Sequence, residues 1–238
     1  MSQPDPTTLS VIMPVYNEQD AIVAAVEEVQ HYVLNHVRGS ELVVVDDGSR
    51  DRTGALLDDA ARSDARVRVI HQPNGGHGSA LLTGLKAAQG EYMFLIDSDR
   101  QIALDNFPSA WSEMITGRDA VFGVRRTRYD PQFRLYLTAV VRRSVNMLFG
   151  IKLRDSNAPY KLFRREVWTN VRDCVPDGTL APSMFLAIAA KSRGYNIVEM
   201  DVTHKERDTG EVSLRRFRLL KFCARGLAQM IGLRSRVR

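Results

Sequence analysis

The chain has 238 residues, of which 44% are hydrophobic, so it can bury one sizeable core. No run approaches the roughly 18 to 20 apolar residues of a membrane-spanning helix, and the N-terminal residues lack the basic-then-apolar pattern of a secretion signal. The two cysteines, Cys174 and Cys223, lie far apart and argue against a disulfide framework or a cysteine metal site. We therefore expect a cytoplasmic protein with one main domain.

Positive charge is concentrated at the C-terminal end. The whole chain has a net charge of +5, but residues 215–238 carry eight Arg or Lys and no acid, so the remainder is net negative. A basic tail on a mildly acidic body indicates an anionic partner, either a membrane surface or nucleic acid.

Strand and helix patterns alternate through the first half of the chain. Short apolar runs that end at polar residues predict strands within residues 9–18, 41–49, 67–73 and 92–97. Apolar residues at helical spacing predict helices at 18–37, 51–64 and 79–90. We expect Ser49 or Asp51 to cap the second of these helices. The alternation predicts an α/β fold with a mostly parallel sheet, helices on both faces, and ligands beyond the carboxyl ends of the strands.

The second half is less regular. Its patterns predict helices at 106–117, 134–150 and 183–194, strands at 119–126 and 195–207, and a loop that becomes a helix at 155–171.

The fourth apolar run ends on two carboxylates one residue apart, Asp97 and Asp99. Residues i and i+2 of a strand point the same way, so their charges repel unless a cation lies between them. Together with the amide of Gln101 they form a set of hard oxygen ligands suited to Mg²⁺ or Mn²⁺, which would bridge a diphosphate. The alternative is that Asp97 caps the next helix and Asp99 is solvated.

Several motifs occur together in the order and approximate spacing of family 2 glycosyltransferases. They read VIMPVYNE, VVVDDGSRDRT, NGGHGSALLTGLKAAQGEYMFLIDSDRQ, GVRR and RDSNAPYKLFRREV. Within that family the chain most resembles the dolichyl-phosphate mannose synthase-like polyprenyl-phosphate glycosyltransferases, over nearly its whole length. The resemblance implies a GT-A fold, which is Rossmann-like. It also implies inverting transfer of a hexose, mannose from GDP-mannose, to a polyprenyl phosphate with the help of a divalent metal.

The resemblance also assigns roles to individual residues. It places nucleotide-sugar binding at Pro14, Tyr16, Asn17, Glu18, Asp46, Asp47, Gly76, Asp97, Ser98 and Arg207. The plainer alternatives are turn formation for Tyr16 and Asn17, and helix capping for Asp46 and Asp47. His77 stands where relatives often carry Lys, and it can equally belong to a surface loop.

For catalysis the resemblance points to Asp99, Arg125, Arg134 and Asp155. Arginine forks match phosphate geometry and stay protonated, so Arg125 and Arg134 suit the diphosphate or the acceptor phosphate. Asp155 would orient the acceptor or act as a base, or it would cap the following helix.

The acceptor is suggested by an absence of acids. Relatives that build saccharides usually place an acidic pair near the acceptor, whereas residues 179–190 here contain none. A phosphate nucleophile is already ionised and needs little beyond positioning, so a lipid phosphate is favoured. The competing hypotheses are a soluble saccharide or small-molecule acceptor, and an inactive nucleotide-binding module tethered by its tail.

The tail itself predicts a basic amphipathic helix. Phe217, Leu220, Ala224, Leu227 and Ile231 recur at three- and four-residue steps among arginines. Such a helix can lie peripherally on an anionic membrane, or it can pack back on the core. Nucleic-acid binding is not expected, because few aromatic residues are interleaved with the basic ones. The expected organisation is a disordered tail at 1–8, a GT-A domain at 9–213 and the basic helix at 214–238.

Overall fold

The computed structural model describes residues 8–125, 132–205 and 216–237, and in the helical stretches 132–137, 216–225 and at 227 it describes the backbone alone. The strands are β1 (Leu9–Val15), β2 (Ser40–Asp46), β3 (Val67–His71), β4 (Tyr92–Ile96), β5 (Ala120–Arg125), β6 (Tyr160–Arg164) and β7 (Ile197–Val202). The α-helices are α1 (Ile22–Val29), α2 (Thr53–Ser63), α3 (His77–Ala87), α4 (Phe107–Ile115), α5 (Gln132–Phe149), α6 (Arg165–Val171), α7 (Pro182–Ser192) and α8 (Arg216–Val237). A π-helical turn, η1 (Gln30–Leu34), continues α1, and a 3₁₀ turn, η2 (Arg172–Cys174), follows α6.

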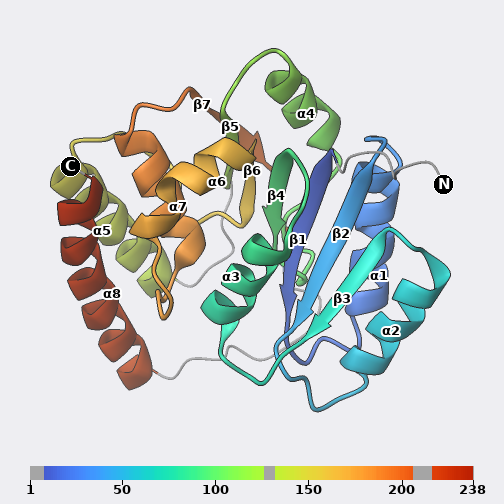
Figure 1. Cartoon of the computed structure of the whole chain (residues 1–238). Coiled ribbons are helices and arrows are strands. Elements are labelled where there is room, and N and C mark those ends of the chain that lie inside the picture. The colour runs from blue at the N-terminus through green and yellow to red at the C-terminus, as the bar shows by residue number, and fades with distance from the viewer. Residues whose placement is uncertain (1–7, 126–131, 206–215, 238) are drawn as a thin grey trace.

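The described strands form one seven-stranded sheet with the order β3-β2-β1-β4-β6-β5-β7 (Figure 1). Strands β1 to β5 and β7 run parallel to one another, whereas β6 is antiparallel to both of its neighbours, β4 and β5. The carboxyl ends of six strands and the amino end of β6 therefore meet at one edge of the sheet. The fold is the predicted mixed α/β fold with a mostly parallel sheet.

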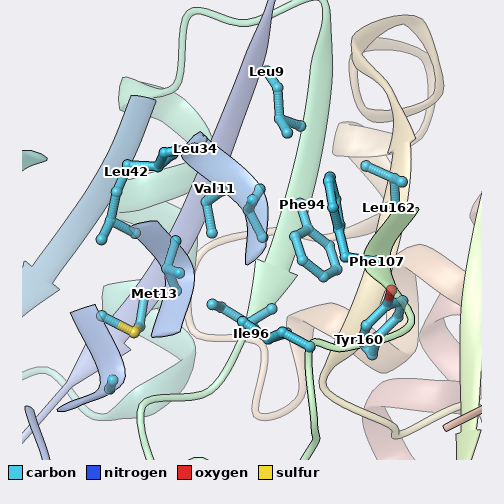
Figure 2. Packing of buried hydrophobic residues seen from close by; sticks show 14 of the residues in the cluster. Leu9, Val11, Met13, Leu34, Leu42, Phe94, Ile96, Phe107, Tyr160 and Leu162 are labelled. Atoms are coloured by element: carbon cyan, nitrogen blue, oxygen red, sulfur yellow. The ribbon is translucent and has the colours of Figure 1, made fainter. Parts of the chain in front are cut away.

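One face of the sheet is covered by α1, η1, α2 and α4. Leu9, Val11, Met13 and Val15 of β1 point to this face because alternate residues of a strand face the same way. Figure 2 shows the centre of this core, where the ring of Phe94 lies 5.3 Å from that of Phe107 and 4.7 Å from that of Tyr160, measured between centroids.

The other face is covered by α3, α6 and α7, with α5 and α8 packed outside them (Figure 1). Helix α3 lies very close to the sheet at Gly84, where an added Cβ would come within 2.4 Å of Cγ2 of Ile12. Glycine at position 84 therefore sets the distance between α3 and β1. It thereby also sets the position of the amino end of α3 at the edge where the carboxyl ends of the strands meet.

The sequence patterns missed β6. Residues 155–171 were expected to pass from a loop into a helix, but Tyr160–Arg164 forms a strand. The run is short and contains Lys161 and Arg164, so its periodicity is weak. Its extended conformation depends on backbone pairing with β4 on one side and β5 on the other, and both partners are distant in sequence.

Helix α8 packs on the body of the protein in its C-terminal half. Met230 and Leu233 are buried in the same core as α7, whereas Ile231 is 60% exposed. Among the residues of the predicted apolar stripe, Ile231 is the one whose side chain the structure describes, and this side chain faces away from the core. In the part of the chain that the structure describes, no helix is both long and apolar enough to cross a membrane.

Candidate active site

Two adjoining cavities open at the edge where the strand ends meet. The smaller has a volume of about 390 Å³ and lies at the carboxyl ends of β1 and β4. Its lining is contributed by the loops after β1, β2, β3 and β4: Pro14, Val15, Tyr16, Glu18, Asp47, Asn74, Gly76, His77, Ala80, Asp97, Ser98 and Asp99. Seven of the residues predicted to bind the nucleotide sugar are in this list, together with Asp99.

Asp47 organises the wall formed by the loop before α3. Its side chain is buried and accepts three hydrogen bonds, from Nε2 of Gln72 at 2.7 Å and from the backbone amides of Gly75 and Gly76 at 2.8 and 2.7 Å. Gly76 has a φ of 85°, a backbone conformation that favours glycine. Asp47 therefore shapes the loop that leads into α3 and does not cap α2.

Two predicted nucleotide-binding residues have structural partners instead. Asn17 has a φ of 53°, and its Oδ1 accepts a hydrogen bond from the amide of Arg50 at 2.8 Å, which joins the loops after β1 and β2. Asp46 accepts from the amide of Ser49 at 3.0 Å and pairs with Nδ1 of His71 at 2.9 Å. Neither residue lines the two cavities; the contacts of Asn17 are those of a turn, and Asp46 joins the ends of β2 and β3.

Asp97 and Asp99 lie just after β4, where the sequence predicted a cation site. Both line the smaller cavity, and the side chain of Asp97 is 33% exposed. Partial burial raises the pKa of the Asp97 carboxyl, and the charge of Asp99 raises that pKa further against the opposing effect of His77. Nε2 of His77 lies 3.8 Å from Oδ1 of Asp97.

These two carboxylates fit a divalent cation. Hard oxygen ligands that face one cavity and repel each other are stabilised by such an ion. Among the described residues, no group of three or more His, Cys, Asp or Glu side chains could hold a metal by itself. Water and diphosphate oxygens would therefore complete the coordination, as is usual for Mg²⁺. Gln101 is absent from the described lining of the smaller cavity, and its backbone oxygen accepts from the amide of Lys205 at 2.8 Å.

Arg125 and Asp155 form a nearly buried, two-pronged ion pair. Nε of Arg125 donates to Oδ2 of Asp155 at 2.8 Å, and Nη2 donates to Oδ1 at 3.1 Å. The side chains are 11% and 6% exposed. Asp155 also accepts from the amide of Asn157 at 3.3 Å, so it orients the loop before β6 and does not act as the cap of α6.

Lys161 is a further titratable group at this edge, which the sequence patterns did not single out. It is 0% exposed at the start of β6, and its Nζ donates a hydrogen bond to the backbone oxygen of Ala158. Burial lowers its pKa from 10.5 to about 7, and the nearby Asp155 partly opposes that effect. The burial of Lys161 results from the antiparallel pairing of β6 with β4 and β5. The sequence pattern around Lys161 indicates a loop and a helix, so it could not predict this burial.

The larger cavity has a volume of about 810 Å³ and adjoins the smaller one at Gly76, His77 and Asp97, which line both. One wall is formed by α3, from His77 to Lys86, and the other by the stretch from Asp177 to Ser183. Asn157 and Pro159, from the loop that Asp155 and Lys161 hold, complete the lining beside Asp97. Asp97 therefore lies at the point where the two cavities meet.

Two remaining predictions have less structural detail. Arg207 lies outside the described residues, and Arg134 lies on α5 where the backbone alone is described. His204 is 8% exposed and forms an isolated bridge with Ile102, the residue after Gln101.

The strand order, the carboxylate pair at the end of β4 and the two cavities agree with the predicted GT-A fold. A sequence profile described as "Glycosyl transferase family 2" matches residues 10–182, and the chain belongs to that family. The predicted family is therefore confirmed.

Relatives with assigned names are similar along most of the chain. An undecaprenyl-phosphate 4-deoxy-4-formamido-L-arabinose transferase from Pseudomonas aeruginosa is 31% identical over 214 residues, which are 89% of this chain and 62% of that protein. A protein of the same name from Aeromonas hydrophila is 29% identical over 213 residues, 89% of this chain and 64% of that protein. The chain thus spans less than two thirds of the length of these relatives.

Solved structures support the GT-A fold. Glucosyl-3-phosphoglycerate synthase from Mycobacterium tuberculosis, in complex with Mn²⁺, UDP and phosphoglyceric acid, superposes with a TM-score of 0.72 and 19% identity, covering 96% of this chain and 78% of that one. A mannosyltransferase from Pyrobaculum calidifontis in complex with GDP-Man and Mn²⁺ gives a TM-score of 0.64 and 22% identity, covering 97% of this chain and 64% of that one. At these identities the similarity shows a shared fold alone.

Proposed function

We propose that the protein transfers a sugar, with inversion, from a nucleotide sugar to a polyprenyl phosphate and depends on a divalent cation. The observation that carries this proposal is the meeting of two cavities at Asp97, one suited to a donor and one to an acceptor. The named relatives, which are undecaprenyl-phosphate transferases, support the lipid acceptor.

The donor would occupy the smaller cavity. Tyr16 is 43% exposed at its rim and can cover a base, while Glu18 and Asp47 can accept from ribose hydroxyls or base N–H groups. A cation held by Asp97 and Asp99 would neutralise charge on the diphosphate and help the nucleoside diphosphate to leave. Because the amides of Gly75 and Gly76 are turned to Asp47, the amino end of α3 would meet the diphosphate through His77.

The acceptor would occupy the larger cavity. Its described acids are Asp97, at the cation site, and Asp177, which pairs with Lys86 at 2.8 Å. A sugar hydroxyl would need a general base there, whereas a phosphate monoester is ionised near neutral pH and needs positioning alone. The described lining thus offers few carboxylates that could act as a general base, and this favours a phosphate nucleophile.

Neither Arg125 nor Asp155 is in the described lining of either cavity, so they would act through the Asn157 loop, which lines the larger one. Asp155 already accepts both prongs of Arg125, so its role is to orient that guanidinium and the Asn157 loop. The guanidinium of Arg125 would provide a fixed positive charge near the transferred group. Arg134 and Arg207 are proposed as further phosphate contacts on the strength of the family resemblance.

Contact with an anionic membrane surface would bring the lipid phosphate to the cavity. Helices α5 and α8 lie side by side at one end of the molecule (Figure 1). Each carries exposed apolar residues next to exposed arginines, namely Val140, Met147, Arg142 and Arg143 on α5, and Ile231, Arg234 and Arg236 on α8. This mixture is typical of surfaces that bind anionic lipid headgroups peripherally, here on the cytoplasmic face.

The donor is proposed as GDP-mannose, and the test is a donor panel. The protein is incubated with a short polyprenyl phosphate, Mn²⁺ or Mg²⁺, and either GDP-mannose, UDP- and dTDP-hexoses, or a nucleotide-linked 4-deoxy-4-formamido-L-arabinose. We expect a lipid-phosphate sugar of inverted anomeric configuration that disappears with chelator. Product from another donor alone would replace GDP-mannose, and transfer to water-soluble acceptors without lipid product would overturn the lipid acceptor.

A further inference from the structure

The wall of the larger cavity opposite α3 is a short loop between η2 and α7. Thr179 turns this loop back on itself, because its amide and its hydroxyl both donate to the backbone oxygen of Pro176, at 3.1 and 2.6 Å. Gly178 has a φ of 80°. These bonds leave the oxygen of Gly178 and the amide of Leu180 to be satisfied from outside the loop.

Gln229 of α8 satisfies both groups with one side chain. Its Oε1 accepts from the amide of Leu180 at 3.0 Å, and its Nε2 donates to the oxygen of Gly178 at 3.0 Å. The side-chain amide thus bonds the loop as a paired strand would, although it comes from a helix about fifty residues further along the chain.

The position of Gln229 is set by the packing of α8. The next residue, Met230, and Leu233 one turn later are 4% and 2% exposed against α7. The thiol of Cys174 also donates to the backbone oxygen of Arg236 at 3.6 Å, which ties the end of α8 to η2. The amide of Gln229 is therefore held in place by a helix that is itself anchored.

On its other side the same loop touches α3. A Cβ at Gly78 would come within 2.6 Å of the backbone oxygen of Thr179, so the first turn of α3 leaves no free space there. Lys86 and Asp177 form an ion pair across the cavity rim at 2.8 Å. Because the loop is confined between α3 and α8, a loss of support from α8 would change the width of the larger cavity.

We propose that Gln229 is a positioning residue that holds the acceptor-side wall, so that α8 is part of the transferase unit. This inference rests on the proposed function in one respect, the assignment of the acceptor to the larger cavity. Binding of α8 at a lipid surface would act on the acceptor cavity through the same two hydrogen bonds.

The test compares Gln229→Met, which keeps side-chain length and loses both bonds, with Gln229→Glu, which keeps the acceptor for Leu180. Ala228→Met is the matched control, because Ala228 is the exposed neighbour on the same helix. Hydrogen–deuterium exchange of a peptide covering residues 177–181 reports on the loop without any reaction. Circular dichroism and the melting temperature verify that each variant folds.

In Gln229→Met we expect exchange in the loop to be faster by about tenfold, from the loss of two hydrogen bonds, with a smaller effect in Gln229→Glu and none in Ala228→Met. With polyprenyl phosphate as the acceptor, KM for the acceptor should rise several-fold while KM for the nucleotide sugar stays constant. Unchanged exchange in Gln229→Met, or equal acceleration in Ala228→Met, would overturn the positioning role.

An equal rise of both KM values would overturn the specific link to the acceptor. If the wild-type protein transfers nothing to polyprenyl phosphate, the proposed function fails, and the exchange experiment still decides whether Gln229 holds the loop.

Discussion

Arg125, at the end of β5, and Asp155, in the loop before β6, are joined by two hydrogen bonds of 2.8 and 3.1 Å and are almost excluded from solvent. Breaking a buried pair leaves one charge without compensation, whereas replacing both partners by apolar groups is often tolerated. The pair therefore allows stability and activity to be separated experimentally.

Asp155→Asn should lower the free energy of unfolding by about 3 to 5 kcal/mol and reduce transfer strongly, because the Arg125 guanidinium loses its buried counter-charge. The double variant Arg125→Met with Asp155→Leu should recover most of the stability and none of the activity. Urea unfolding and transfer assays on the same preparations make the comparison. Recovery of activity in the double variant would show that the pair has a structural role alone.

Asp99→Asn should weaken cation binding and reduce metal-dependent transfer by at least about a hundredfold, because the cation would lose one of its two carboxylate ligands. Mn²⁺ binding can be followed by electron paramagnetic resonance without any substrate. Asp59→Asn, at an exposed position on α2, is the control and should leave binding unchanged. Equal Mn²⁺ affinity in Asp99→Asn and wild type would remove Asp99 from the cation site.

Lys161 should impose a pH dependence on stability. Its pKa is lowered from 10.5 to about 7 in the folded state, chiefly by burial. Between these values the unfolded chain binds one more proton than the folded chain, so the free energy of unfolding rises with pH, by at most about 1.4 kcal/mol per pH unit.

The measurement is urea unfolding of wild type and Lys161→Met at pH 7, 8 and 9. The difference between the two proteins should change with pH in favour of the wild type as pH increases. A difference that is constant over this range would mean that Lys161 titrates normally in the fold.

Gly84→Ala should destabilise the protein by about 1 to 3 kcal/mol, because the added methyl overlaps Cγ2 of Ile12 at the contact between α3 and β1. Gly232→Ala is the matched control on α8, where a Cβ meets nothing within 4 Å. That change should stabilise the helix by up to about 1 kcal/mol. Thermal unfolding of the two variants should therefore shift in opposite directions, and equal shifts would contradict the close approach of α3.

The family and the carboxylate pair could be predicted from the sequence because they are local. Each strand–loop–helix step of the first half lies within a few tens of residues, and parallel strands bring their carboxyl ends together whatever the loops contain. The smaller cavity, with Asp47, Asp97 and Asp99 in its lining, follows from that rule.

Tertiary contacts decided the rest. Antiparallel β6 is a strand because β4 and β5 pair with it, and that pairing buries Lys161 and brings Asp155 to Arg125. The contact of Gln229 with the loop before α7 likewise joins segments about fifty residues apart. The sequence by itself determined which chemical groups stand at the strand ends, since strand periodicity and turn residues are properties of neighbouring residues. Which of those groups face a ligand and which bind one another was decided by the tertiary structure alone, since such pairs are distant in sequence and meet only when the sheet is complete.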